Sequence, residues 1–264
     1  MLKKRLIGVV TVRGGLAVQS FGYRRYLPLG RPECLVENLD RWGADEILLQ
    51  VIDRSQNGAG PDFKLLRRIG RLGIGSPLMY GGGIGSVDDA LRVVEAGADR
   101  VLIDALLSDR PESVGYISER LGAQAVVGSL PLSIDADGLQ LLDYRVRQSV
   151  PFGERLSQLL ASGLVSEALV IDHLHEGAPS AFDERLVSMF PVPGLPLIPF
   201  GGISDTAQMS GLLGQEVVSA VASGNFLNYR EHAVQRYKEG LTRVSIRPAS
   251  FESRHPSVPV YGRD

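Results

Sequence analysis

The chain repeats part of its sequence at half its length. VIDRSQNGA at residues 51–59 returns as VIDHLHEGA at residues 170–178, which is 119 positions later. Two further pairs have the same offset, namely Gly82-Gly83-Ile84 with Gly201-Gly202-Ile203 and Phe63 with Phe182. A shared offset at three separated places predicts two halves of similar structure.

Each half alternates short apolar segments with amphipathic segments. The apolar segments are rich in Val, Ile and Leu on both faces, which is typical of buried parallel strands. They cover residues 6–12, 46–53, 77–80, 100–104, 125–131, 167–172, 195–200 and 217–222. Residues 61–72 and 86–97 have helical spacing, and Ser86 with Asp89 forms a capping box for the second of them.

Four strand–helix units in each half predict a (β/α)8 barrel made of two half-barrels. A doubly wound open sheet is the alternative, which the even spacing and the duplication disfavour. We expect the barrel to span residues 1–244, with half-barrels at about 1–120 and 121–240. Residues 245–264 contain three prolines and no helical pattern, so they predict a loosely ordered tail outside the barrel.

Composition limits the class of partner. The chain has 28 Lys and Arg residues against 30 Asp and Glu residues, so no basic surface predicts nucleic acid binding. Apolar residues make up 44%, enough for a large core, and the single Cys34 excludes an internal disulfide and fits a reducing compartment. No apolar stretch is long enough to cross a membrane. The sequence therefore predicts a cytoplasmic protein with neither a membrane nor a nucleic acid partner.

Two glycine loops follow predicted strands. Glycine lets the backbone approach a phosphate closely, and a helix that begins after the loop offers free N–H groups. Two such loops, one in each half, predict two phosphate sites at one mouth of the barrel, although glycines that only permit tight turns are the alternative. Ser223 and Gly224 complete the second site, whereas Asp104 at the equivalent place in the first site would repel a phosphate. The predicted phosphate-binding residues are Gly82, Gly83, Gly201, Gly202, Ser223 and Gly224.

The motifs along the barrel resemble those of a known family. They are MLKKRLIG, ADEILL, YGGGI, GADRV, GAQAVVGS, SEALVID followed by EG, and GGI followed by AVASGNF, over about residues 1–240. The chain resembles the HisF family, the cyclase subunit of imidazole glycerol phosphate synthase. Within it, the nearest resemblance is to HisF-like proteins of bacterial surface-polysaccharide pathways. The resemblance implies a two-fold-symmetric barrel, a substrate with two phosphates, and a glutaminase partner, HisH, that supplies ammonia through the bottom of the barrel.

The expected catalytic groups of that family are missing. The resemblance implies two catalytic aspartates, at the ends of strands 1 and 5, and these positions hold Thr11 and Pro131. Neither side chain replaces a carboxylate in acid–base chemistry at neutral pH. Asp53 and Asp172, which end strands 2 and 6, are the remaining acid–base candidates, and capping of their loops is the alternative.

The bottom of the barrel keeps the family's pattern. The resemblance implies a gate for ammonia made of Arg5, Glu46, Arg100 and Glu167, each at the start of a strand. Asp99 corresponds to a contact with the glutaminase. A ring of ion pairs that only stabilises the barrel is the alternative for the gate.

The remaining polar side chains suggest no further chemistry. His173, His175 and Glu176 lie in one loop, which we interpret as part of the barrel rim, so we predict no metal and no cofactor. The run Arg24-Arg25-Tyr26 lies in the long loop after strand 1 and either closes over an anion or is solvated.

Three functions follow from these readings. The first is a HisF-like subunit that receives ammonia from a HisH-like glutaminase for an amino or amidino sugar, with a sugar amidotransferase as a further partner. The second is a true cyclase that uses Asp53 and Asp172. The third is a module that only binds a phosphorylated small molecule.

Overall fold

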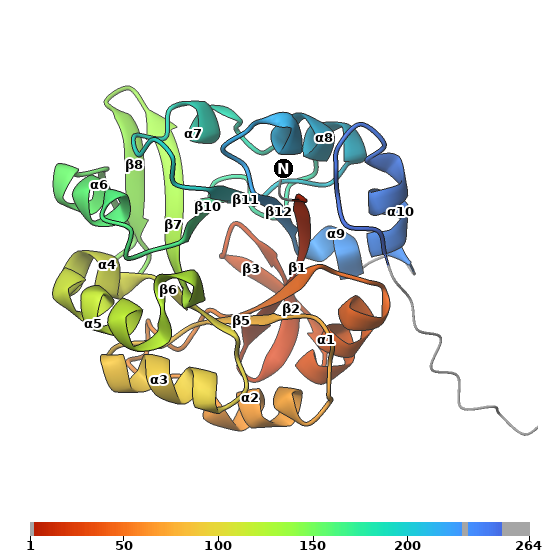
Figure 1. Cartoon of the computed structure of the whole chain (residues 1–264), viewed down its shortest axis with the longest axis horizontal. Coiled ribbons are helices and arrows are strands. Elements are labelled where there is room, and N and C mark those ends of the chain that lie inside the picture. Colours follow the sequence, from red (N-terminus) through yellow and green to blue (C-terminus); the bar gives the residue numbers. More distant parts are fainter. Residues whose placement is uncertain (1–2, 229–231, 250–264) are drawn as a thin grey trace, which may run out of the picture.

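Eight parallel strands close into a barrel in the computed structural model, which describes residues 3–228 and 232–249 (Figure 1). The barrel strands are β1 (Arg5–Arg13), β4 (Glu46–Val51), β5 (Leu78–Gly81), β6 (Arg100–Ile103), β7 (Val126–Asp135), β10 (Glu167–Asp172), β11 (Leu197–Phe200) and β12 (Ala220–Ser223). From β1 to β11 each barrel strand pairs with the next, β12 pairs with β1, and a bridge between Leu197 and Val218 joins β11 to the segment before β12. The predicted (β/α)8 barrel is confirmed.

Helices cover the outside of the barrel (Figure 1). They are α1 (Pro32–Arg41), α2 (Phe63–Gly70), α3 (Val87–Glu95), α4 (Ala105–Asp109), α5 (Pro111–Leu121), α6 (Glu154–Ala161), α7 (Arg185–Ser188), α8 (Thr206–Gly214), α9 (Asn225–Asn228) and α10 (Ala233–Gly240), with a 3₁₀ turn, η1, at Ala123–Ala125. The predicted capping box of α3 is confirmed, because the Ser86 hydroxyl accepts the Asp89 N–H at 3.1 Å and Asp89 accepts the Gly85 N–H at 3.1 Å.

The two halves have the same order of elements. Each begins with a barrel strand and a β-hairpin, and then alternates helices with three more barrel strands. The hairpins are β2 (Leu16–Phe21) with β3 (Arg25–Gly30) and β8 (Gly138–Asp143) with β9 (Gln148–Pro151). This order bears out the two similar halves that the repeat predicts.

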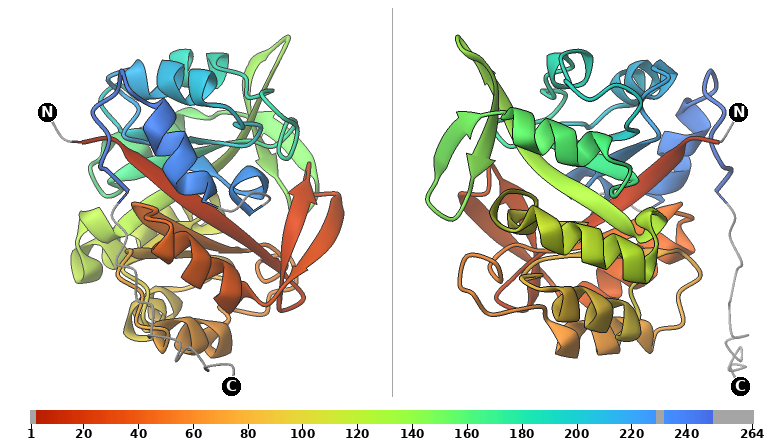
Figure 2. Two further views of the ribbon diagram at one scale, coloured as in Figure 1. Left: turned by 90° about the vertical axis from the view of Figure 1, so that its right-hand side faces the viewer. Right: turned by 60° about the vertical axis from the view of Figure 1, so that its left-hand side comes forward.

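The hairpins correct the interpretation of the sequence. We expected a long loop after strand 1, but β2 and β3 pair there and place Arg25 and Tyr26 in a strand. Both hairpins project from the end of the barrel opposite to the N-terminus (Figure 2). β3 and β9, the second strand of each hairpin, are largely reached by water, so the apolar pattern of a buried strand is absent from them.

β7 continues through Pro131, where we expected the strand to end. Pro131 pairs with Ile171 of β10 on one side, while β6 has already ended opposite Gly128 and β8 begins pairing only at Leu132. A proline is tolerated in this gap because no neighbour requires its missing N–H.

Apolar side chains fill the barrel and also the space between the barrel and its helices. The interior cluster consists of Ile7, Val9, Leu48, Met79, Leu102, Val127, Leu169, Ile171, Ile198, Phe200, Ala220 and Ala222. A larger cluster joins the outer faces of the strands to the helices. The barrel interior is therefore packed, as the fold requires, and the strand ends carry the polar groups.

The described part of the predicted tail is attached to the barrel. The Lys4 N–H donates to the Ser245 carbonyl at 2.9 Å, and Ile246 forms a parallel bridge with Lys4. The start of the predicted tail, at residues 245–246, is therefore not the loosely ordered segment that we expected. Residues 250–264 lie outside the described residues. No helix in the described ranges is long and apolar enough to span a membrane.

Candidate functional site

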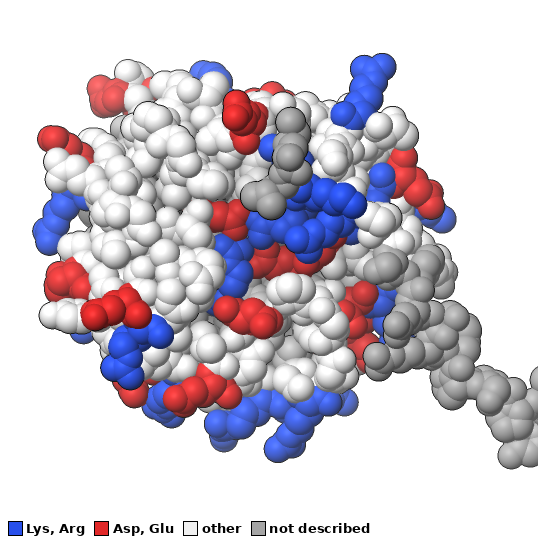
Figure 3. Space-filling view, in the orientation of Figure 1, with Lys and Arg blue, Asp and Glu red and all other residues white. Residues whose placement is uncertain are grey.

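Four charged side chains form a closed ring at the bottom of the barrel, where the strands begin. Arg5 contacts Glu46 at 2.7 Å and also Glu167, while Arg100 contacts Glu46 at 3.1 Å and Glu167 at 2.7 Å. The four side chains are 3–18% exposed. Basic and acidic side chains gather at the centre of this face in Figure 3. The structure thus brings together the four predicted gate residues, which we call the charged ring.

Further hydrogen bonds fix the charged ring. Ser219 donates to Glu167, and Arg100 donates to the Ser166 hydroxyl at 3.0 Å and to the Gln124 carbonyl at 3.1 Å. Burial raises the pKa of Glu46, and the guanidinium groups of Arg100 and Arg5 oppose part of that rise. Each carboxylate is bridged by both arginines, so no member leaves the ring without breaking two ion pairs.

Asp99 lies on the same face and is exposed. Its Oδ2 accepts the Leu78 N–H at 2.8 Å, as Asp45 accepts the Leu6 N–H at 2.8 Å. Asp99 therefore fixes the start of β5. Its contact with a glutaminase stays a prediction.

The second glycine loop, Gly201-Gly202, lines a small cavity at the opposite end of the barrel. Their φ angles are 100° and 78°, and an added Cβ would lie 2.6 Å from the Asp172 carbonyl oxygen or 2.8 Å from the Phe182 nitrogen. Only glycine fits here. Glu176, Gly177, Phe200, Gly201, Gly202, Ile203, Ala222, Ser223, Gly224, Asn225 and Phe226 line the cavity.

Backbone donors are available in this cavity. Among the described residues, no acceptor takes the N–H groups of Gly202 or Gly224. The Ser223 hydroxyl donates to the Ile203 carbonyl at 3.2 Å. Unpaired backbone N–H groups in a recess attract an anion, and phosphate binding at this loop stays a prediction.

In the first glycine loop, Gly82-Gly83, the N–H group of Gly83 is already bound. The Gly83 N–H donates to the Ser55 hydroxyl at 2.8 Å, which donates to Asp104 at 3.2 Å. Asp104 also accepts the Ala105 N–H at 2.6 Å and the hydroxyl of Tyr144. Burial raises the pKa of Tyr144, with the Asp104 charge adding to the rise, so this hydroxyl stays protonated and donates.

Asp172 and Asp53 have different surroundings. Asp172 is 1% exposed and accepts hydrogen bonds from the backbone of His175 and Asp183, at 3.2 and 2.8 Å, and its Oδ2 lies 2.7 Å from His175 Nδ1. Asp53 accepts the Gly14 N–H at 2.8 Å, and its buried Oδ1 has no partner among the described residues. Asp172 thus holds its loop together, while Asp53 retains a free oxygen.

The hairpin of β2 and β3 lies across the top of the barrel. Glu176 accepts from the Ser20 hydroxyl at 2.9 Å and the Tyr23 N–H at 3.2 Å, and its carbonyl accepts the Gly22 N–H at 2.8 Å. Asn225 bonds both backbone groups of Ser20, at 2.6 and 3.2 Å. Burial raises the pKa of Glu176, and the bonds from Ser20, Tyr23 and Gly22 oppose it. We call Glu176 and Asn225 the hairpin clamp.

Tyr23 closes the top of the barrel interior. It packs against the interior cluster, and its hydroxyl lies 3.2 Å from Gln50 Oε1. Burial is the main cause that raises its pKa well above the ordinary value. Our sequence interpretation missed Tyr23, Asn225 and Tyr144 because only the folded hairpins bring them to the strand ends. A single tyrosine in a polar segment carries no signal of that kind.

The histidines of the β10 loop do not converge on a common point. His175 contacts Asp172, Glu176 faces the hairpin, and the Nε2 atom of His173 is buried with no partner among the described residues. Burial lowers the pKa of His173, although Asp172 partly opposes the shift. No cluster of three or more His, Cys, Asp or Glu side chains in the described ranges could hold a metal ion.

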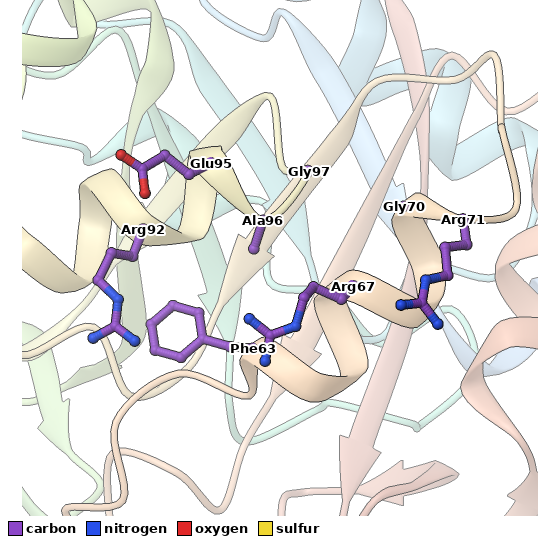
Figure 4. A pocket seen from close by; sticks show the side chains of 8 residues that line it. All are labelled: Phe63, Arg67, Gly70, Arg71, Arg92, Glu95, Ala96 and Gly97. Carbon is purple, nitrogen blue, oxygen red and sulfur yellow. The ribbon is translucent and has the colours of Figure 1, made fainter.

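A further groove lies on the outside of the barrel between α2 and α3. Figure 4 shows Arg92 beside the ring of Phe63, with 4.3 Å from its guanidinium carbon to the ring centroid, and Arg67 and Arg71 along α2. None of its lining residues belongs to the charged ring or to the two glycine loops, so the groove is not part of the candidate site.

Comparison with known proteins fits this geometry. A model of the family described as histidine biosynthesis protein matches residues 5–233. The chain belongs to this family. It is 27% identical to a putative imidazole glycerol phosphate synthase subunit of Vibrio vulnificus over 249 residues, covering 93% of this chain and 91% of that protein.

Two other members of the histidine biosynthesis family align with this chain over nearly their whole length. The HisF subunits of imidazole glycerol phosphate synthase from Natranaerobius thermophilus and Staphylococcus aureus are 24% and 27% identical. The alignments cover 93% of this chain and 98% and 99% of the two relatives. The predicted HisF resemblance is confirmed, while the surface-polysaccharide subgroup stays a prediction.

In β1 and β7 the chain differs from the pattern that the family resemblance implied. Thr11 is 5% exposed in β1, and Pro131 is partly buried in β7, where the resemblance implied carboxylates. The two positions supply no carboxylate, so any acid–base chemistry must come from other groups at the top of the barrel.

Proposed function

We propose that this chain is the HisF-like barrel of a glutamine amidotransferase complex. It receives ammonia from a HisH-like glutaminase at its bottom face and passes it toward an acceptor at its top face. The charged ring of Arg5, Glu46, Arg100 and Glu167 carries the proposal. The curated relatives are named as subunits of imidazole glycerol phosphate synthase, which supports a role within an assembly.

The charged ring suits the control of ammonia entry. It lies below an apolar interior cluster, which accepts neutral ammonia far more readily than ammonium because burying a charge costs much more than burying a small neutral molecule. Each arginine is held by two carboxylates, so entry requires a coordinated shift of at least one side chain. Partner binding at this face would supply the energy for that shift.

The acceptor binds at the top through the second glycine loop. Gly202 and Gly224 offer N–H groups to a phosphate there. We assign the complex to the making of an amino or amidino sugar for a surface polysaccharide, with a sugar amidotransferase as a third component. This assignment rests on the resemblance of the sequence to that subgroup.

Glutaminase stimulation tests the proposal. The partner to use is a HisH-like glutaminase from the same organism, and glutamate release from glutamine is measured with and without the barrel. We expect the barrel to raise the rate, and Glu46→Ala or Arg5→Ala to change the stimulation at least severalfold. Glu37→Ala is the matched control, because Glu37 forms an exposed pair with Arg41 on α1. A rate that is indifferent to the barrel contradicts the proposal.

Asp53 supports a second candidate, a cyclase with relocated catalytic groups. Its buried Oδ1 has no partner among the described residues, as a general base awaiting a substrate would. Turnover of the family's cyclase substrate that is lost in Asp53→Asn, with folding unchanged, would favour this candidate. No turnover by the wild-type barrel with saturating ammonium would exclude it.

A further inference from the structure

The two glycine loops occupy equivalent places in the fold, but different side chains lie beside them. We infer that the ligand is bound through one phosphate group, at the second glycine loop, because Asp104 and Tyr144 fill the equivalent site at the first glycine loop. The inference rests on the proposed phosphate binding and narrows the ligand to a monophosphorylated compound.

Asp104 takes the place that a phosphate would occupy in the first half. It stands 119 positions before Ser223, the equivalent residue of the second site. Its carboxylate binds the Ala105 N–H at 2.6 Å and, through Ser55, reaches the Gly83 N–H. The donors equivalent to those of Gly202 and Gly224 are therefore already used. A dianion entering here would lose these bonds and meet a like charge.

Tyr144 reinforces this internal carboxylate. Its hydroxyl donates to Asp104, and it lies in the turn between β8 and β9. The next residue, Arg145, fixes the turn because its guanidinium contacts Asp143 at 2.8 Å and Asp109 at 2.5 Å. The ion pairs of Arg145 therefore fix the turn that carries Tyr144.

The second site has no equivalent filling. Ser223 stands where the first half has a carboxylate, and its hydroxyl is satisfied by the Ile203 carbonyl. Glu176 lines this cavity, but its carboxylate is bound to Ser20 and to the Tyr23 backbone. The N–H groups of Gly202 and Gly224 are left without an acceptor in the described part of the chain. One loop can therefore accept a phosphate while the other cannot.

Amide NMR with inorganic phosphate tests the inference. The full chain is labelled with ¹⁵N and titrated at constant ionic strength, with sodium sulfate and sodium chloride as comparison salts. We expect the cross-peaks of Gly202 and Gly224 to move with saturation while those of Gly83 and Ala105 stay in place. Saturable movement at the first loop, or none at the second, would overturn the inference.

Exchanging the equivalent residues provides matched variants. Ser223→Asp should weaken phosphate binding at the second loop about tenfold or more, since it introduces the carboxylate that the first half accommodates. Asp104→Ser combined with Tyr144→Phe should add saturable movement at Gly83. Unchanged binding in Ser223→Asp, or no gain in the double variant when both remain folded by circular dichroism, would contradict the assignment.

This experiment is independent of the proposed complex. It uses no glutaminase, so a barrel that does not stimulate the partner can still bind one phosphate at the second loop. Conversely, a barrel that stimulates the glutaminase but binds phosphate at both loops would retain the proposed function and reject the single-phosphate ligand.

Discussion

Glu46 lies against two guanidinium groups with only 3% of its side chain exposed. Replacing it with alanine leaves Arg5 and Arg100 with Glu167 as their remaining carboxylate partner. We expect Glu46→Ala to lower the free energy of unfolding by about 3 kcal/mol, the lower end for a broken buried ion pair, because Glu167 persists. Urea denaturation measures the change. Glu37→Ala, in an exposed pair, should cost about 0.5 kcal/mol or less, and equal losses would refute a role for burial.

Protonation of the buried His173 contributes to the loss of folding stability as the pH falls. Burial lowers its pKa, so the folded state binds the proton less readily than the unfolded chain. Its contribution is complete above the unfolded pKa of about 6.5 and is lost as pH falls through the lower folded pKa. His173→Gln should therefore lose less stability than the wild type between about pH 7 and pH 5. Urea denaturation at a series of pH values measures the difference between the two proteins, and parallel pH profiles would contradict the role assigned to His173.

At the scale of elements, the hairpin of β2 and β3 depends on contacts from other loops. Glu176 and Asn225 hold Ser20 and Tyr23 by hydrogen bonds that are largely buried. Glu176→Ala removes two of these bonds, which is worth about 1–3 kcal/mol of local stability. Amide exchange in β2 and β3 should become about tenfold faster or more.

The second hairpin is the internal control for that experiment. Within the described ranges, no hydrogen bond of Glu176 or Asn225 reaches β8 or β9, so amide exchange in these two strands should stay within about twofold. Equal acceleration in both hairpins would show global destabilisation. Glu176→Gln should retain most of the protection, because the amide oxygen still accepts hydrogen bonds.

At the scale of the whole molecule, buried contacts attach α10 to the first half of the barrel. Lys238 of α10 forms an ion pair with Asp45 at 2.8 Å and donates to the Gly43 carbonyl at 2.7 Å, and both side chains of the pair are 4% exposed. The contact joins the last described helix to the start of β4. It therefore secures the second half of the barrel against the first.

Lys238→Met should be strongly destabilising for that reason. It leaves the buried Asp45 carboxylate without its cation, which costs about 3–5 kcal/mol. Thermal unfolding should shift to a lower midpoint and remain a single transition, because the two halves share one barrel. Arg41→Met, which removes an exposed pair, should change the midpoint little. A shift of the same size in both variants would contradict a special stabilising role of the buried Lys238–Asp45 pair.

Much of the fold could be predicted because its signals are local. Apolar runs such as residues 46–53 and 167–172 predicted β4 and β10, and Ser86 with Asp89 predicted the start of α3. The residues of the charged ring could be named from the resemblance, since each begins a strand. The phosphate sites stay predictions, although the second glycine loop has the free donors that such a site requires.

By itself, the sequence determined the barrel, its duplication and the placement of glycines at two strand ends. Periodicity, capping and positive φ angles act over a few residues, so they are readable without the fold. Only the tertiary structure decided that Tyr144 reaches Asp104, that Tyr23 covers the barrel interior, and that the two glycine loops differ in their free donors. Those contacts join segments distant in the chain, and hydrogen bonding between them depends on how the hairpins fold back over the strand ends.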